Sequence, residues 1–200
     1  MIRIRKARKE DCSFIARMVM MALHITIEDN ERLYCHMVEL VEDEHTLYHW
    51  SRAMIAEETG DSTEGCMSSV RDDDALPVGL CLAYDGADYH ERRVYSFSFV
   101  CADGKPVSEN NGELLAQPDE SERGEFYVDS LAVIPEQRGK GIGKMMLCEA
   151  LRRASMLGLT PSILVDPNNA PALNLYKSVG FVFEEEMRVF GENYHKYKVK

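Results

Sequence analysis

Glycines and basic side chains alternate in the last third of the chain, in the stretch Arg138-Gly139-Lys140-Gly141-Ile142-Gly143-Lys144. An apolar run precedes the stretch and an amphipathic run follows it, which indicates a strand, a loop and a helix in that order. The first amides of a helix have no partner within the helix, and the helix dipole places partial positive charge there. Glycines leave the backbone open to a ligand. The pattern therefore predicts an anion site that suits phosphate.

Two well-known phosphate motifs do not fit this loop. The P-loop pattern needs a glycine where Arg138 stands and a Ser or Thr where Met145 stands. The dinucleotide pattern G-x-G-x-x-G fails in both frames, because Lys144 or Met146 occupies its last position. Asp166, after the next expected strand, is the one feature shared with dinucleotide-binding folds. A dinucleotide site and an ordinary surface turn with solvated lysines stay as alternatives.

The elements that position this loop are clearest in the last third of the chain. Apolar runs bounded by Pro and Gly alternate there with stretches of helical periodicity. The expected elements are a strand over Phe126–Ile134, a helix over Lys144–Leu157, a strand over Ile163–Val165, a helix from Asn168 or Asn169 to Gly180, and a hairpin of Phe181–Val189 with Tyr194–Val199.

The first part of the chain gives a weaker pattern of the same kind. Apolar residues alternate with charges at the start, and helical periodicity follows. The expected elements are a strand at Ile2 and Ile4, a helix capped by Asp11, helices over Glu31–Glu44 and Thr46–Glu58, strands over Cys66–Arg71 and Val78–Tyr84, a helix over Asp88–Val100, and a long loop over Ala102–Gly124.

Two motifs in sequence resemble a known family. Arg138-x-x-Gly141-x-Gly143 follows Leu131-Ala132-Val133, and it precedes Asn169-x-x-Ala172-x-x-x-Tyr176-x-x-x-Gly180-Phe181. In this order and at this separation they resemble the GNAT superfamily of acyl-CoA N-acyltransferases, over about residues 125–200. The resemblance implies an α/β (α+β) fold: a mixed, twisted, mostly antiparallel sheet of about seven strands, with helices on both faces and a splayed central strand pair. It also implies a single domain over residues 1–200.

The resemblance further implies acetyl-CoA as cosubstrate and no metal. The amides of the loop would hold the pyrophosphate of acetyl-CoA, and main-chain groups of the preceding strand would pair with its pantetheine arm like an added strand. Asn169 would contact the pantetheine, and Tyr176 would lie near the thioester. The implied cofactor residues are Leu131, Val133, Arg138, Gly139, Lys140, Gly141, Ile142, Gly143, Lys144, Asn169 and Tyr176.

The implied reaction is direct attack of a neutral primary amine on a thioester in a ternary complex. Tyr176 is the expected proton donor to the leaving thiolate. A base must take the proton of the amine, and the candidates are Asp129, which we prefer, and Glu125. Both share one face with Tyr127 if the strand is regular, and a bulge would change that face. A non-catalytic acyl-CoA-binding regulatory module is the alternative function.

Composition and charge limit the remaining choices. The 200 residues carry a formal net charge of −11, which disfavours nucleic acid as a partner. Acidic residues dominate 28–44, in keeping with a small cationic amine or a peptide amine as acceptor. The six cysteines are widely spaced, and the N-terminus lacks the pattern of a signal peptide. We therefore expect a cytoplasmic protein without a membrane partner, and family analogy suggests a homodimer.

Overall fold

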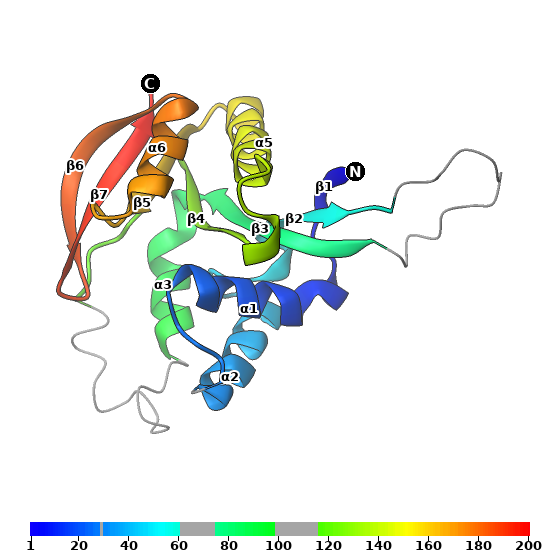
Figure 1. Cartoon of the computed structure of the whole chain (residues 1–200). Helices are drawn as coiled ribbons and strands as arrows, with labels where there is room; N and C mark the ends of the chain where they lie inside the picture. Colours follow the sequence, from blue (N-terminus) through cyan, green and yellow to red (C-terminus); the bar gives the residue numbers. More distant parts are fainter. Residues whose placement is uncertain (29, 61–74, 99–115) are drawn as a thin grey trace.

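The computed structural model describes residues 1–28, 30–60, 75–98 and 116–200. Within them, seven strands form one mixed sheet in the order β1-β2-β3-β4-β5-β7-β6 (Figure 1). Only β4 and β5 pair in parallel among these neighbours. The strands are β1 Ile2–Lys6, β2 Ala53–Glu58, β3 Leu76–Asp85, β4 Glu125–Val133, β5 Thr160–Val165, β6 Phe181–Val189 and β7 Glu192–Val199. The expected mixed, mostly antiparallel sheet is confirmed.

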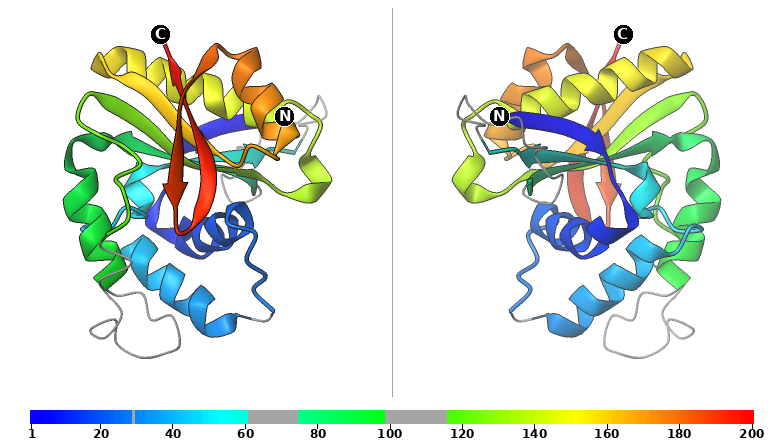
Figure 2. Two further views of the ribbon diagram at one scale, coloured as in Figure 1. Left: turned by 90° about the vertical axis from the view of Figure 1, so that its left-hand side faces the viewer. Right: turned by 90° about the vertical axis from the view of Figure 1, so that its right-hand side faces the viewer.

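Helices cover both faces of this sheet (Figures 1 and 2). On one side lie α1 Cys12–Ala22, α2 Glu31–Glu42 and α3 Tyr89–Ser98, and on the other lie α5 Ile142–Leu157 and α6 Ala170–Ser178. The β6–β7 hairpin extends from the level of α6 down to the level of α1 (Figure 2). The α1 face and the α5 face of the sheet are named after these helices below.

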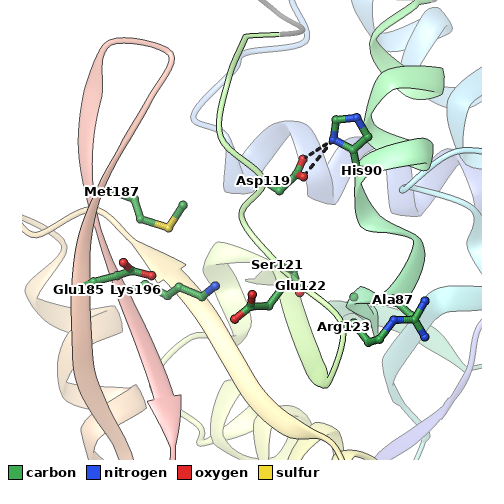
Figure 3. A pocket seen from close by; sticks show the side chains of 10 residues that line it. Ala87, His90, Asp119, Ser121, Glu122, Arg123, Glu185, Met187 and Lys196 are labelled. Carbon is green, nitrogen blue, oxygen red and sulfur yellow. Dashed lines mark hydrogen bonds and ion pairs between the residues drawn. The ribbon is translucent and has the colours of Figure 1, made fainter.

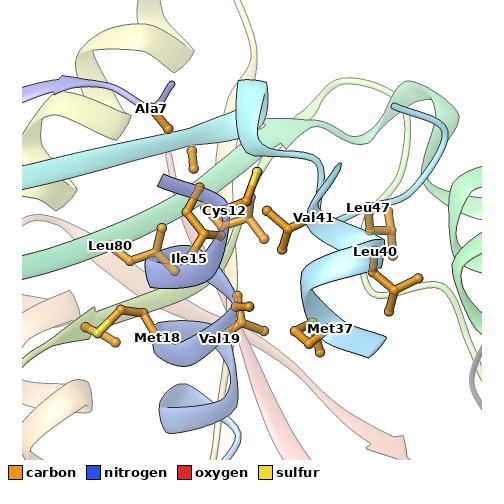
Figure 4. Close-up of a cluster of buried hydrophobic side chains, with 14 of the residues drawn as sticks. Ala7, Cys12, Ile15, Met18, Val19, Met37, Leu40, Val41, Leu47 and Leu80 are labelled. Atoms are coloured by element: carbon orange, nitrogen blue, oxygen red, sulfur yellow. The ribbon is translucent and has the colours of Figure 1, made fainter. Parts of the chain in front are cut away.

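A separate apolar cluster fills each side of the sheet. On the α1 face, Ile15, Met18 and Val19 of α1 are fully buried against Leu80 of β3 (Figure 4). Their spacing of three and four residues places them on one side of the helix. On the α5 face, the fully buried residues of α5 are Met146, Leu147, Ala150 and Ala154. Both helices are thus fixed against the sheet by the stripe of apolar residues that their sequences show.

A bulge interrupts β4 at Asp129. Ala83 of β3 pairs with Val128, but the neighbouring Leu82 pairs with Ser130, so Asp129 is the extra residue. A bulge of this kind reverses the alternation of side chains along a strand. Before it, Tyr127 packs into the α1-face cluster, whereas beyond it Leu131 and Val133 pack into the α5-face cluster.

The parallel pairing of β4 with β5 is short. It joins Glu125–Val128 to Thr160–Ile163 and ends at the bulge. Beyond Val128, β4 and β5 no longer pair with each other, although β4 stays paired with β3 as far as Val133. This is the splayed central strand pair that the family resemblance implies.

The helix expected over Thr46–Glu58 is wrong. Its second half is β2, and a short 3-10 turn at Trp50–Arg52 precedes that strand. Residues Ala53–Ala56 are fully buried, because the strand is covered on both faces and lies between β1 and β3. A short, continuously apolar run shows neither the two-residue period of a strand nor the 3.6-residue period of a helix.

The other expected elements form close to their expected bounds. The helix of Glu31–Glu44 ends at Glu42. The strand expected over Cys66–Arg71 lies wholly outside the described residues. Most of the loop expected over Ala102–Gly124 also lies outside them. Among the described residues no helix has the length and apolarity needed to cross a bilayer, and no cluster of three or more metal-ligating side chains occurs.

Candidate active site

The glycine loop turns sharply from the end of β4 into α5. Gly139 and Gly141 both have φ near +77°, a conformation that other residues adopt only with strain. Gly141 is the N-cap of α5, and no side chain caps the helix there. The first amides of a 16-residue helix are therefore left for a ligand or water. Ile142 is buried and anchors the turn to the α5-face cluster.

Three cations surround this helix start. Arg138 donates from Nε to the carbonyl oxygen of Val133 at 3.0 Å, and Lys140 donates from Nζ to Oε1 of Gln137 at 2.6 Å. Arg138, Lys140 and Lys144 are all exposed. In a chain of net charge −11, they make this end of α5 a local positive region that suits an anion.

Beyond the bulge, the edge of β4 on the β5 side is not paired with another strand among the described residues, and the side chain of Arg138 donates to the carbonyl of Val133 there. Ile134 donates its N–H to the carbonyl of Val78 on the β3 side, at 3.0 Å. Residues of an antiparallel strand alternate in the edge to which their N–H and C=O point. The N–H and C=O groups of Leu131 and Val133 therefore point away from β3, to the edge that β5 has left. An extended ligand chain fits there as an added strand.

The second motif forms the start and middle of α6. Asn169 is the N-cap of this helix, and its Oδ1 accepts from the N–H of Ala172 at 3.1 Å. Tyr176 is buried in the α5-face cluster, with its ring centroid 6.0 Å from that of Phe181. Burial, together with the nearby Cys81, raises the pKa of Tyr176 to about 12, so its phenol is protonated at neutral pH.

Asp129 lies at the bulge, where β4 and β5 part. Its Oδ2 accepts from the hydroxyl of Tyr84 at 2.5 Å, and its Oδ1 accepts from that of Ser130 at 2.9 Å. Burial raises the pKa of this carboxyl, and the two hydrogen bonds only partly counter the effect. Arg52 lies near it and stacks over the ring of Tyr84, 5.0 Å from the centroid.

Glu125, at the start of the same strand, has a different environment. Its Oε2 lies 3.0 Å from Nζ of Lys196, and its Oε1 lies 2.8 Å from Nζ of Lys198. Ser162 and Ser121 donate to the same carboxylate, at 2.9 and 3.2 Å. Burial would raise the pKa of Glu125, but the hydrogen bonds from the two lysines outweigh it and hold the pKa below its ordinary value.

A third carboxylate, Glu120, was not among the sequence candidates. It lies just before β4 and is half-buried, with its Oε2 accepting from the hydroxyl of Tyr127 at 2.5 Å. Tyr89 of α3 also hydrogen-bonds to it. Burial, reinforced by the charge of Asp129, raises the pKa of Glu120 to about 7. Its place in a stretch read as a long loop gave no signal that could single it out.

The segment that carries Glu120 is fixed on its other side by Asp119. The carboxylate of Asp119 accepts from Nε of Arg93 at 2.9 Å and contacts Nδ1 of His90 at 3.0 Å. Figure 3 shows the His90 contact at the rim of a cavity of about 390 Å³, which lies between this segment and the β6–β7 hairpin. A side chain at Gly86 would collide with Ser121, so the segment lies directly on the turn after β3.

Comparison with known proteins agrees with this geometry. The model of the Acetyltransferase (GNAT) family matches residues 28–181, which is most of the chain and includes both motifs. The chain belongs to the GNAT family of acetyltransferases. The GNAT fold inferred from the two motifs is confirmed.

Individual relatives are more distant. Mycothiol acetyltransferase of Thermobifida fusca (strain YX) is 30% identical over 121 residues, which are 58% of this chain and 32% of that protein. The match thus spans about a third of that relative. An N-acetyltransferase of Staphylococcus aureus Mu50 has the same fold, with a TM-score of 0.72, 22% identity, and coverage of 98% of this chain and 100% of that one.

One solved relative carries a ligand. The structure of yncA from Salmonella typhimurium contains its cofactor acetyl-CoA. It matches with a TM-score of 0.55 and 18% identity, over 100% of this chain and 93% of that one. At these identities, both structural matches establish the fold of this GNAT protein.

Proposed function

We propose that this GNAT enzyme transfers an acetyl group from acetyl-CoA to the primary amine of a small cationic molecule, by direct attack in a ternary complex. The observation that carries the proposal is the position of the bulge. β4 parts from β5 at Asp129, so a main-chain edge without a strand partner in the described part of the chain and a half-buried carboxylate occur next to each other. The edge would pair with an acyl-CoA arm, and the carboxylate would attract an ammonium group.

The residues of the chain fit acetyl-CoA. The uncapped start of α5 and the cations Arg138, Lys140 and Lys144 suit a pyrophosphate. The main-chain edge at Leu131 and Val133 suits the amides of a pantetheine arm. Bound acetyl-CoA supplies a thioester, which reacts with neutral amines. Asn169 would contact that arm in addition to its capping role.

Tyr176 would donate the proton that the leaving sulfur needs. Its pKa of about 12 keeps the phenol protonated at pH 7. Transfer to a thiolate of ordinary pKa, about 8.5, is uphill by about 3.5 units or about 5 kcal/mol. Burial in the same site disfavours a thiolate as it does a phenolate, which narrows this gap. One main-chain N–H of this edge would stabilise the negative charge on the acetyl oxygen, and the remaining groups would pair with the pantetheine arm.

The acceptor side is acidic. Asp129 lies on the α1 face, and Glu120 lies close enough for the charge of Asp129 to raise its pKa. Two neighbouring carboxylates favour an acceptor with more than one positive charge. The acidic stretch of residues 28–44 includes α2, on the same side of the sheet.

An amine panel tests this function. Purified protein is incubated with acetyl-CoA and a polyamine, an aminoglycoside, a lysine peptide or a neutral monoamine, and acetylated product is measured by mass. Product mass is preferable to a thiol reagent, because the thiols of Cys35 and Cys148 are exposed. We expect acetylation of at least one multiply charged amine, with a higher kcat/KM than the monoamine. Binding of acetyl-CoA without acetylation of any amine would contradict the proposal.

A further inference from the structure

Glu120 and Asp129 are connected by a cluster of tyrosines. Tyr127 donates to Glu120, and Tyr84 donates to Asp129, both at 2.5 Å. The rings of Tyr84 and Tyr127 lie 6.0 Å apart, and the ring of Tyr89 lies 5.9 Å from that of Tyr127. All three rings are at most 4% exposed. The two carboxylates are therefore held in place by a rigid aromatic cluster.

We propose, on the basis of the function proposed above, that Glu120 takes the proton from the acceptor ammonium, while Asp129 provides a fixed negative charge beside it. This assigns the base to a residue outside both family motifs and outside the strands. It also gives Asp129 an electrostatic role in place of proton transfer.

Hydrogen bonding separates the three carboxylates. Both oxygens of Asp129 accept hydroxyl hydrogen bonds, and both oxygens of Glu125 face lysines. The lysine contacts hold Glu125 in its charged form, so it accepts a proton less readily than an ordinary carboxylate. Glu120 accepts only from the neutral hydroxyls of Tyr127 and Tyr89, and, like Asp129, it is half-buried, so it can exchange a proton with solvent.

The charges around Glu120 set the pH at which it works. Burial and the charge of Asp129 raise its pKa, while the hydrogen bonds of Tyr127 and Tyr89 and the charge of Arg93 lower it. The result, about 7, is near the value at which a general base is most effective in neutral solution. Tyr48 and Tyr194 also lie near enough for the charge of Glu120 to raise their own pKa values.

The proton transfer balances. One N–H bond of the ammonium breaks, its electron pair stays on nitrogen, and the proton passes to the carboxylate of Glu120 and then to solvent. The neutral amine forms the new C–N bond, and the C–S bond of the thioester breaks with its electron pair left on sulfur. Tyr176 gives sulfur a proton and regains one from the second excess proton on nitrogen, so the net reaction releases one proton.

The pH profile of kcat/KM for an accepted amine is the first test. For the wild type we expect a rising limb with an apparent pKa near 7 that does not change with the acceptor. Glu120→Gln should lose this limb and about 10²- to 10⁴-fold in rate. Asp129→Asn should move the limb to lower pH, because the charge that raises the pKa is gone. Glu122→Gln, an exposed neighbour, is the matched control and should keep both rate and limb.

A titration without substrate is the second test. The carboxyl carbon of Glu120 is followed by ¹³C NMR in the free protein and assigned with Glu120→Gln. We expect a pKa near 7 that falls in Asp129→Asn. Titration below pH 5, or a Glu120→Gln enzyme with the wild-type rate and limb, would overturn the inference and leave the proposed function intact. A wild type that acetylates no amine would instead overturn the proposed function, and the inference with it.

Discussion

Glu125 on β4 and Lys198 on β7 form an ion pair, 2.8 Å from Oε1 to Nζ, that reaches past the intervening strand β5. Lys196, on the same strand as Lys198, holds the other carboxylate oxygen and is 4% exposed. The group therefore joins the parallel core of the sheet to the C-terminal hairpin. Its position indicates a structural charge cluster at the closed end of the β4–β5 pair.

Glu125→Gln should destabilise the fold, because it leaves the buried Lys196 without its counter-charge and Lys198 with the longer contacts to Glu122 and Glu184, at 3.8 and 4.0 Å. Removal of one partner of a buried ion pair costs about 3–5 kcal/mol. The pKa of Glu125 is below its ordinary value, so its contribution is present above pH about 4.5 and is lost as pH falls through the folded-state pKa. In urea unfolding, the free energy of unfolding of the variant should fall far below that of the wild type at pH 7, and by less at pH 3.

The acetylation rate of Glu125→Gln distinguishes a structural role of Glu125 from a catalytic one. Acetylation by the folded variant should stay close to that of the wild type, and Glu185→Gln, exposed on β6, should match the wild type in both stability and rate. A stable Glu125→Gln protein with a rate lowered 10²-fold or more would instead indicate that Glu125 is the base.

Gly141→Asp should weaken acetyl-CoA binding at least about tenfold, or 1.4 kcal/mol, because it places a carboxylate where phosphates are expected. Gly158→Asp is the matched control: Gly158 caps the other end of α5 and also has a positive φ, near +68°. Its backbone strain is similar, so its affinity in calorimetric titration should equal that of the wild type. Equal losses in both variants would show that strain, and not the phosphate site, is responsible.

Tyr176→Phe should lower kcat by about 10²–10⁴-fold and leave the Kd of acetyl-CoA unchanged. The phenyl ring keeps the packing against Phe181, so only the proton is lost. Tyr197→Phe removes a hydroxyl from an equally buried ring of the same cluster and should keep full activity. A fall of similar size in both variants would assign the effect to packing.

Glu120→Gln should make the protein more stable at alkaline pH. The raised pKa means that folding favours the protonated form: this stability is full below the ordinary pKa of about 4.5 and is lost as pH rises through about 7. A shift of about 2.5 units corresponds to about 3 kcal/mol at most. Melting temperatures of variant and wild type should therefore diverge between pH 5 and pH 8. Parallel curves would mean that Glu120 titrates normally.

The sequence predicted the backbone of the glycine loop and of the α6 cap better than the surroundings of the carboxylates. The loop of Gly139 and Gly141 and the cap at Asn169 are local features, and the residue types themselves specify their backbone. The raised pKa of Glu120 instead depends on Asp129 and on tyrosines from other elements, which only the folded chain brings together. The strand β2 was missed because burial on both faces removes the alternation that identifies a strand.

The bulge at Asp129 makes strand length more critical than residue type in this part of the chain. One extra residue makes Tyr127 face one side of the sheet and Leu131 the other. Deletion of a single residue between them would move every downstream side chain of β4 to the opposite face of the sheet. Relatives that keep this arrangement should therefore tolerate substitutions in β4 far more readily than insertions or deletions, and an alignment with a gap there would pair residues from opposite faces.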